Sequence, residues 1–102
     1  MSDYILGDDA VLDLEDVWEY VARDSVEAAD GWIAKLFEAF EMVARAPGIG
    51  HKREDWTNYP VLFSTAGAYL IIYRATPGQS VEIVAVTQGS RDIPAFLRQR
   101  FQ

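Results

Sequence analysis

Two amphipathic helices joined by a very short connection constrain the fold of this sequence more than any other feature. In residues 9–23, apolar side chains recur at steps of three and four, which is the period of an α-helix with one buried face. Asp24, followed three places later by Glu27, fits a capping arrangement that starts a second such helix, and Pro47 with Gly48 ends it. The two apolar stripes consist of Val11, Leu14, Val17, Trp18 and Val21, and of Ala29, Trp32, Ile33, Leu36, Phe40 and Val43. Only two or three residues separate the helices, so they must pack as an antiparallel hairpin.

The acidic residues of the first helix lie opposite its apolar stripe. Asp9, Asp13, Asp16 and Glu19 occupy this other side. Carboxylates on a solvated face imply no cleft, whereas groups that act in catalysis lie in environments that perturb them. We therefore interpret these four residues as a solvated face and not as paired catalytic acids.

After the hairpin, the apolar pattern changes from a helical to a strand-like period. Residues 46–60 are too rich in Gly, Pro and charge to form an element. Three short β-rich runs follow, which are VLFS at 61–64, AYLIIYRA at 68–75 and VEIVAVTQG at 81–89. The segment between the last two runs predicts a hairpin turn at Pro77 and Gly78, and the apolar run 4–6 can add a brief fourth strand.

The last residues predict a short amphipathic helix. Ile93, Phe96, Leu97 and Phe101 are apolar at helical spacing, and Asp92 is placed to cap the start of the helix. Together the elements predict an α+β fold, in which the two-helix hairpin packs on one face of a small antiparallel sheet of three main strands. Such a hairpin leaves apolar sheet surface uncovered, and an uncovered apolar groove is normally a binding site.

Composition narrows the class of protein. With 102 residues, half of them apolar, the chain fits one domain over residues 1–102. There is no apolar stretch of about 20 residues for a bilayer span and no signal-peptide pattern, so we expect a cytoplasmic protein without a membrane partner. No cysteine, one histidine, and no phosphate-cradling glycine loop or G-x-S-x-G motif point to no metal, no cofactor and no small-molecule substrate.

Charge is divided unevenly along the chain. Residues 1–41 carry twelve acids against Arg23 and Lys35, whereas residues 42–102 carry seven bases against four acids. The total of -7 repels phosphate backbones at long range, so direct nucleic-acid binding is disfavoured even though the second half is basic.

Two arginines lie at the ends of the predicted strands. Arg74 closes one strand near the hairpin turn, whereas Arg91 follows the next strand at the far end, so the two cannot form one phosphate clamp. Arg91 lies near the start of the preceding strand, and near Lys52 and Arg53 if the linker folds back. Two interpretations of Arg91 stay open, which are an ion pair with Asp92 or a helix acid, and a functional role.

The ordered set of segments resembles the ParE branch of the RelE/ParE toxin superfamily, the toxin halves of bacterial type II toxin-antitoxin modules. The matching features are the helical hairpin, its PGIG exit, GAYLIIYR, VEIVAV and GSRD, and they cover nearly the whole chain. Members of the RelE type cleave messenger RNA in the ribosome and carry an arginine after the tyrosine of the third feature and a tyrosine in the C-terminal segment. This chain has Leu70 at the first position and Phe96 or Leu97 at the second, and it has Gln88 where ParE members often have histidine.

The resemblance implies a toxin without enzymatic activity, which binds and inhibits DNA gyrase and is neutralised by a ParD-like antitoxin. It implies target contacts at Arg91, Asp92 and Arg74, with no catalytic residues. A disordered antitoxin segment is then expected to fold across the uncovered groove. The aromatic side chains that we expect it to cover are Trp56, Phe63, Tyr69 and Tyr73. The alternatives are a RelE-like ribosome-dependent endoribonuclease in which Arg91 stabilises the phosphate, and an inactive ParE-like protein that only binds a partner.

Overall fold

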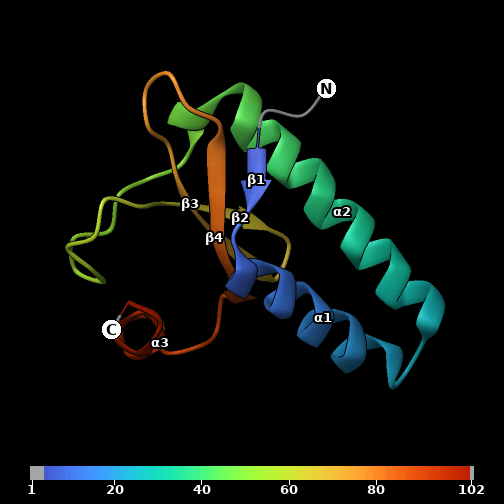
Figure 1. The fold of residues 1–102 in the computed structure, drawn as a ribbon. Coiled ribbons are helices and arrows are strands. Elements are labelled where there is room, and N and C mark those ends of the chain that lie inside the picture. The colour runs from blue at the N-terminus through green and yellow to red at the C-terminus, as the bar shows by residue number, and fades with distance from the viewer. Residues whose placement is uncertain (1–3, 102) are drawn as a thin grey trace.

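The computed structural model describes residues 4–101 and has the predicted α+β architecture (Figure 1). Residues 1–3 and 102 of the predicted domain lie outside this description. The elements in chain order are β1 (Tyr4–Leu6), α1 (Asp8–Ala22), α2 (Val26–Arg45), a short 3₁₀ helix (Pro47–Ile49), β2 (Leu62–Ala66), β3 (Tyr69–Arg74), β4 (Val81–Gln88) and α3 (Ile93–Arg100). The antiparallel helical hairpin and the short C-terminal helix are confirmed.

The residue that caps α2 differs from the prediction. The hydroxyl of Ser25 accepts a hydrogen bond from the backbone N–H of Ala28 at 3.1 Å, so Ser25 and not Asp24 is the N-cap. A hydroxyl three positions before an unpaired N–H satisfies one of the free donors at the start of a helix. The cap predicted for α3 is confirmed, because Asp92 accepts from the N–H of Ala95 at 3.2 Å.

The four strands form one mixed sheet in the order β1-β4-β3-β2. The pairs β2–β3 and β3–β4 are antiparallel, as predicted for the three main strands. The brief N-terminal strand is present and lies parallel to β4, where it pairs only with residues 81–83. A two-residue turn joins β2 to β3, and Gly67 in it has φ +60, a conformation that favours glycine. A Cβ atom at Gly67 would also overlap the Trp32 ring, so the turn and α2 fit closely.

A bulge interrupts the ladder between β3 and β4. Ile72 lies opposite Ala85, whereas Tyr73 lies opposite Ile83, so Val84 is an additional residue on β4. The side chains of Ile83 and Val86 belong to one face of the sheet, and those of Val84 and Ala85 to the other. The bulge therefore sets which face each of the last residues of β4 occupies.

The helical hairpin covers one face of the sheet and forms the main core. This core joins the inner side chains of both helices to those of β3 and β4, namely Ala10, Leu14, Val17, Leu36, Phe40, Val43, Tyr69, Ile71, Tyr73, Val81, Ile83 and Val86. At its edge the phenol of Tyr73 donates to the carbonyl of Pro47 at 2.6 Å and accepts from the N–H of Gly50 at 2.9 Å. Burial raises the pKa of Tyr73, and the bond from Gly50 opposes this shift.

The opposite face of the sheet is also covered, which corrects the expectation of an uncovered apolar surface. Figure 1 shows α3 on the side of the sheet away from α1 and α2. There Ile93 and Leu97 of α3 are buried against Phe63, Leu70, Ile72 and Ala85, and Trp56 and Val61 of the linker complete this second cluster. The chain thus buries both faces with its own side chains. Sequence periodicity could not predict this, because α3 and the linker reach the sheet only through tertiary packing.

Among the helices of residues 4–101, none combines the length and the apolarity that crossing a bilayer requires.

The Tyr73 hydroxyl gives a test of how the linker is attached. Tyr73→Phe leaves the Gly50 N–H and the Pro47 carbonyl without their partner in a partly buried site, so we expect the free energy of unfolding to fall by about 1–3 kcal/mol in urea titrations. Tyr59→Phe is the matched control, because its hydroxyl donates to the carbonyl of Phe101 at an exposed site. Equal losses in the two variants would contradict this account.

Candidate functional site

The C-terminal half of β4 has a strand neighbour on one side only. Pairing with β1 ends at Ile83, whose carbonyl accepts from the N–H of Gly7 at 2.9 Å before the chain turns into α1. From Ala85 to Gln88, β4 pairs with β3 alone. An unpaired strand edge presents free N–H and C=O groups, which need other partners.

Asp13 of α1 supplies one such partner. Its carboxylate accepts a hydrogen bond from the N–H of Val86 at 2.9 Å and is held by Arg100 of α3, at 2.8 Å and 3.1 Å. Asp13 is 9% exposed, so the expectation that all four acids of α1 belong to a solvated face is wrong for this residue. The spacing of Asp13 in the sequence indicates that it is buried. It follows Ala10 by three residues and precedes Val17 by four, and both of these residues are buried.

Arg100 completes this arrangement at the bulge. Its guanidinium also bonds to the carbonyl of Val84 at 3.4 Å, while Asp9 lies 3.9 Å from it at the more exposed side. A buried carboxylate is costly unless it is paired and fully hydrogen-bonded, and here three hydrogen bonds from Val86 and Arg100 satisfy it. Asp13 and Arg100 thus join α1, β4 and α3.

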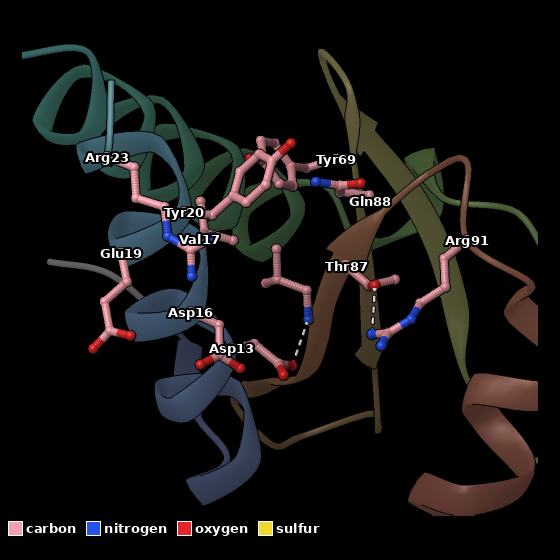
Figure 2. A pocket seen from close by; sticks show the side chains of 11 residues that line it. Asp13, Asp16, Val17, Glu19, Tyr20, Arg23, Tyr69, Thr87, Gln88 and Arg91 are labelled. Atoms are coloured by element: carbon pink, nitrogen blue, oxygen red, sulfur yellow. Dashed lines mark hydrogen bonds between the residues drawn. The ribbon is translucent and has the colours of Figure 1, made fainter. Parts of the chain in front are cut away.

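A cleft of about 530 Å³ lies beside this network, between α1 and the end of β4. Figure 2 shows its two walls, with Asp13, Asp16, Glu19 and Arg23 on the α1 side and Arg91 on the side of β4. We call this cleft the β4 groove. Its lining comprises Asp13, Asp16, Val17, Glu19, Tyr20, Arg23, Tyr69, Val86, Thr87, Gln88 and Arg91. Charges of both signs therefore face each other across an unpaired strand edge.

Arg91 is held in the groove without an acidic partner. Its guanidinium donates to the hydroxyl of Thr87 at 3.2 Å and lies 4.8 Å from the centre of the Phe96 ring. None of the ion pairs among residues 4–101 includes Arg91, and Asp92 caps α3 instead. Of the two interpretations left open by the sequence, the ion pair is not formed, and Arg91 is an oriented cation that faces a cleft.

Two further cavities extend the β4 groove at its ends. One, of about 620 Å³, shares Tyr20, Tyr69 and Gln88 with the groove and adds the ring of Trp32 and the turn at Gly67. The other, of about 350 Å³, shares Asp13, Asp16 and Arg91 with it and reaches α3. The hollow surface therefore continues along the edge of β4 from α3 to the β2–β3 turn.

The other predicted basic residues lie elsewhere. Arg74 at the end of β3 is 3.5 Å from Glu82, opposite which it pairs, whereas Arg91 follows the other end of β4, so their predicted separation is confirmed. Arg53 pairs with Asp55 at 2.7 Å and lies over the ring of Trp56, and the hydrogen bond from Arg53 holds the pKa of Asp55 below its ordinary value. Lys52 and Arg53 line a separate cavity in the linker, to whose lining Arg91 does not belong.

The four aromatic side chains predicted to meet an antitoxin differ in exposure. Phe63, Tyr69 and Tyr73 are at most 5% exposed and belong to the two cores of the sheet. Only Trp56 is half-buried, with its edge against Phe63. A partner could reach Phe63 and Tyr73 only by displacing the parts of the chain that cover them, whereas Tyr69 also lines the β4 groove. The role of these residues as direct contacts stays a prediction.

The acidic side chains do not gather into a metal site. Within residues 4–101 no three His, Cys, Asp or Glu side chains are grouped so that they could hold a metal ion. The chemistry available in the β4 groove is therefore that of charged, amide, hydroxyl and backbone groups.

Comparison with known proteins gives consistent results. A family model described as the ParE toxin of the type II toxin-antitoxin system parDE matches residues 4–93. Toxin ParE1 of Caulobacter vibrioides is 33% identical over 98 residues, which are 95% of this chain and 99% of that protein. A solved structure described as a chromosomal ParDE TA system from P. aeruginosa has a TM-score of 0.69 at 18% identity, over 86% of this chain and 96% of that one, and supports the fold.

The contribution of Asp13 can be measured against its exposed neighbour. Asp13→Ala leaves the Val86 N–H and the Arg100 charge without their partner, so we expect the free energy of unfolding to fall by about 3 kcal/mol. Asp16→Ala, one turn of the helix away and exposed, should change it by less than about 0.5 kcal/mol. Urea denaturation followed by tryptophan fluorescence measures both, and a small loss in Asp13→Ala would refute the bridging role.

Proposed function

Because the chain belongs to the family of ParE toxins of type II toxin-antitoxin systems, we propose that it binds and inhibits DNA gyrase and that a ParD-like antitoxin neutralises it. The activity is one of binding and not of catalysis. The toxin would act in the cytoplasm, where gyrase works. Membership of the family does not by itself identify gyrase as the target of this chain.

The environment of Arg91 supports a binding surface at the end of β4. A guanidinium that is fixed by Thr87 and Phe96, and that has no carboxylate partner among residues 4–101, is ready to meet an anionic group of another protein. Arginines in such oriented settings dominate the energetics of many interfaces. Asp92, the next residue, uses one carboxylate oxygen to cap α3 and keeps the other for the target.

Arg74 belongs to this proposal in a different way. It lies at the opposite end of the sheet and is paired with Glu82, so it can contact the target only if the interface extends along the sheet. An exposed pair of this kind contributes little to stability, so the arginine remains available to a stronger partner. The target surface that we propose is therefore centred on Arg91 and Asp92, with Arg74 as an outlying contact.

We propose that the antitoxin binds where the chain has exposed surface. Trp56 retains exposed area, whereas Phe63, Tyr69 and Tyr73 are covered by the chain itself. Tyr69 nevertheless lines the β4 groove and the cavity next to it, so its edge can be approached from there. Family membership and the likeness to a ParDE structure support an antitoxin as the partner.

Expression of the chain alone in a bacterial host tests the target. Inhibition of gyrase predicts growth arrest with an induced DNA damage response while protein synthesis continues at first. Arrest of protein synthesis without DNA damage would refute the gyrase proposal and indicate a RelE-type ribonuclease. A culture that grows normally would instead indicate an inactive relative that only binds a partner.

Arg91→Ala tests the proposed surface. Removing the cation that faces the target should weaken gyrase binding by about tenfold or more and restore growth, while the thermal midpoint stays unchanged because Arg91 takes part in none of the ion pairs of residues 4–101. Arg98→Ala is the matched control on α3, since Arg98 is exposed and does not line the β4 groove, and it should remain toxic. Full toxicity of Arg91→Ala would exclude this surface.

A further inference from the structure

We propose that Phe96 is a positioning residue for Arg91. Its ring holds the guanidinium in the β4 groove, oriented before the target binds, and the ion pair of Asp13 with Arg100 in turn holds the ring. Phe96 acts through Arg91 and makes no contact with the target itself. This inference rests on the proposed function, and it extends the residues that determine target binding from the end of β4 to α3 and α1.

The ring of Phe96 is shared by two arginines. Its centre lies 4.8 Å from the guanidinium carbon of Arg91 and 4.7 Å from that of Arg100. Both distances are within the range at which the face of an aromatic ring attracts a cation. Phe96 and Arg100 are four residues apart on α3, a spacing that places side chains on the same face of a helix. One ring therefore connects the cation in the groove to a cation of the buried network.

The Arg100 side of this arrangement is fixed. Both oxygens of Asp13 accept from its guanidinium, at 2.8 Å and 3.1 Å, and a paired contact of this kind sets the plane of the guanidinium. Ile93 and Leu97 anchor the backbone of α3, because both are buried against the sheet. Phe96 thus extends from a fixed helix beside a fixed neighbour.

The Arg91 side depends on the ring. Arg91 is exposed, and its guanidinium donates one hydrogen bond, to Thr87 at 3.2 Å. A long side chain held at a single point keeps much of its rotamer freedom. A partner that binds it must then restrict this freedom, which lowers the affinity. The contact with Phe96 is a second point of attachment that restricts the guanidinium in advance.

The ring also keeps Arg91 apart from the acids of its own chain. Asp16 and Arg91 both line the β4 groove and the cavity that continues it toward α3. Neither takes part in the ion pairs of residues 4–101. An arginine released from the ring would be attracted to this carboxylate, and an arginine paired within its own chain is less available to a target. Holding the guanidinium in place therefore preserves its charge for the partner.

Gyrase binding tests the role of Phe96. Phe96→Leu should weaken binding of the full chain to purified gyrase by about three- to tenfold, whereas Phe96→Tyr keeps a ring face and should bind as the wild type does. Phe101→Leu is the matched control, because Phe101 packs against the same core cluster but lies on the ring of Tyr59, at 4.2 Å. Equal losses in the two leucine variants would make Phe96 a packing residue only and overturn the proposal.

A double-mutant cycle distinguishes positioning from direct contact. In an Arg91→Ala background, Phe96→Leu should cause no further loss of gyrase binding, because the ring acts through the guanidinium. An undiminished loss in that background would show that Phe96 contacts the target itself, and the positioning role would be wrong.

NMR of the free toxin tests the contact without any target. Protons above a ring face are shifted upfield, so the Nε–H resonance of Arg91 should lie upfield of that of the exposed Arg98. Phe96→Leu should abolish this shift, whereas Phe101→Leu should preserve it. An Arg91 resonance that does not respond to Phe96→Leu would overturn the proposal. If the resonance responds but the wild type binds no gyrase, the proposed target is wrong while the positioning of Arg91 is confirmed.

Discussion

The carboxylate of Asp13 is the group on which the arrangement of the site depends. It joins α1 to Val86, which lies 73 residues later in the sequence, and to Arg100, which lies 87 residues later. Because β1 pairs with only the first residues of β4, the backbone beyond Ile83 would otherwise face α1 with no partner. The carboxylate takes the place of one strand hydrogen bond and also fixes where α3 lies. A buried ion pair of this kind is weak support for stability on its own, but its hydrogen-bond geometry permits only one arrangement of the three elements.

Periodicity was sufficient for the local elements and insufficient for their long-range partners. The hairpin, the three main strands and the cap at Asp92 follow from residues close in sequence, and the structure contains them all. The prediction that Asp13 lies on the solvated face is wrong. The neighbouring acids of α1 favour that assignment, although the spacing of Asp13 from Ala10 and Val17 places it toward the core. The bulge at Val84 and the cover over the second sheet face depend on pairing and packing that no short stretch of sequence determines.

The sequence indicates only one side of the candidate site. Arg91 stood out because it follows a buried strand, but its neighbours across the groove come from α1, about 70 residues away along the chain. In the structure Arg91 forms no ion pair with Asp92, and Thr87 and Phe96 orient its guanidinium. Of the four aromatic residues predicted to contact the antitoxin, Phe63, Tyr69 and Tyr73 lie in the core, since large rings are the main means by which a small domain fills its interior. Exposure, which decides whether a ring can meet a partner, is a tertiary property.

The extra residue in β4 also bears on how such a chain can vary in length. Because Val84 and Ala85 lie on the side of α3 while Ile83 and Val86 lie on the hairpin side, deleting Val84 would restore the regular alternation and leave Val86 on its present face. The loss of this residue would therefore remove the bulge and the carbonyl that Arg100 contacts, while the side chains beyond it keep their faces. The groove that carries Arg91 thus depends on an uninterrupted alternation from Ala85 to Gln88, where the loss of one residue would turn the later side chains over.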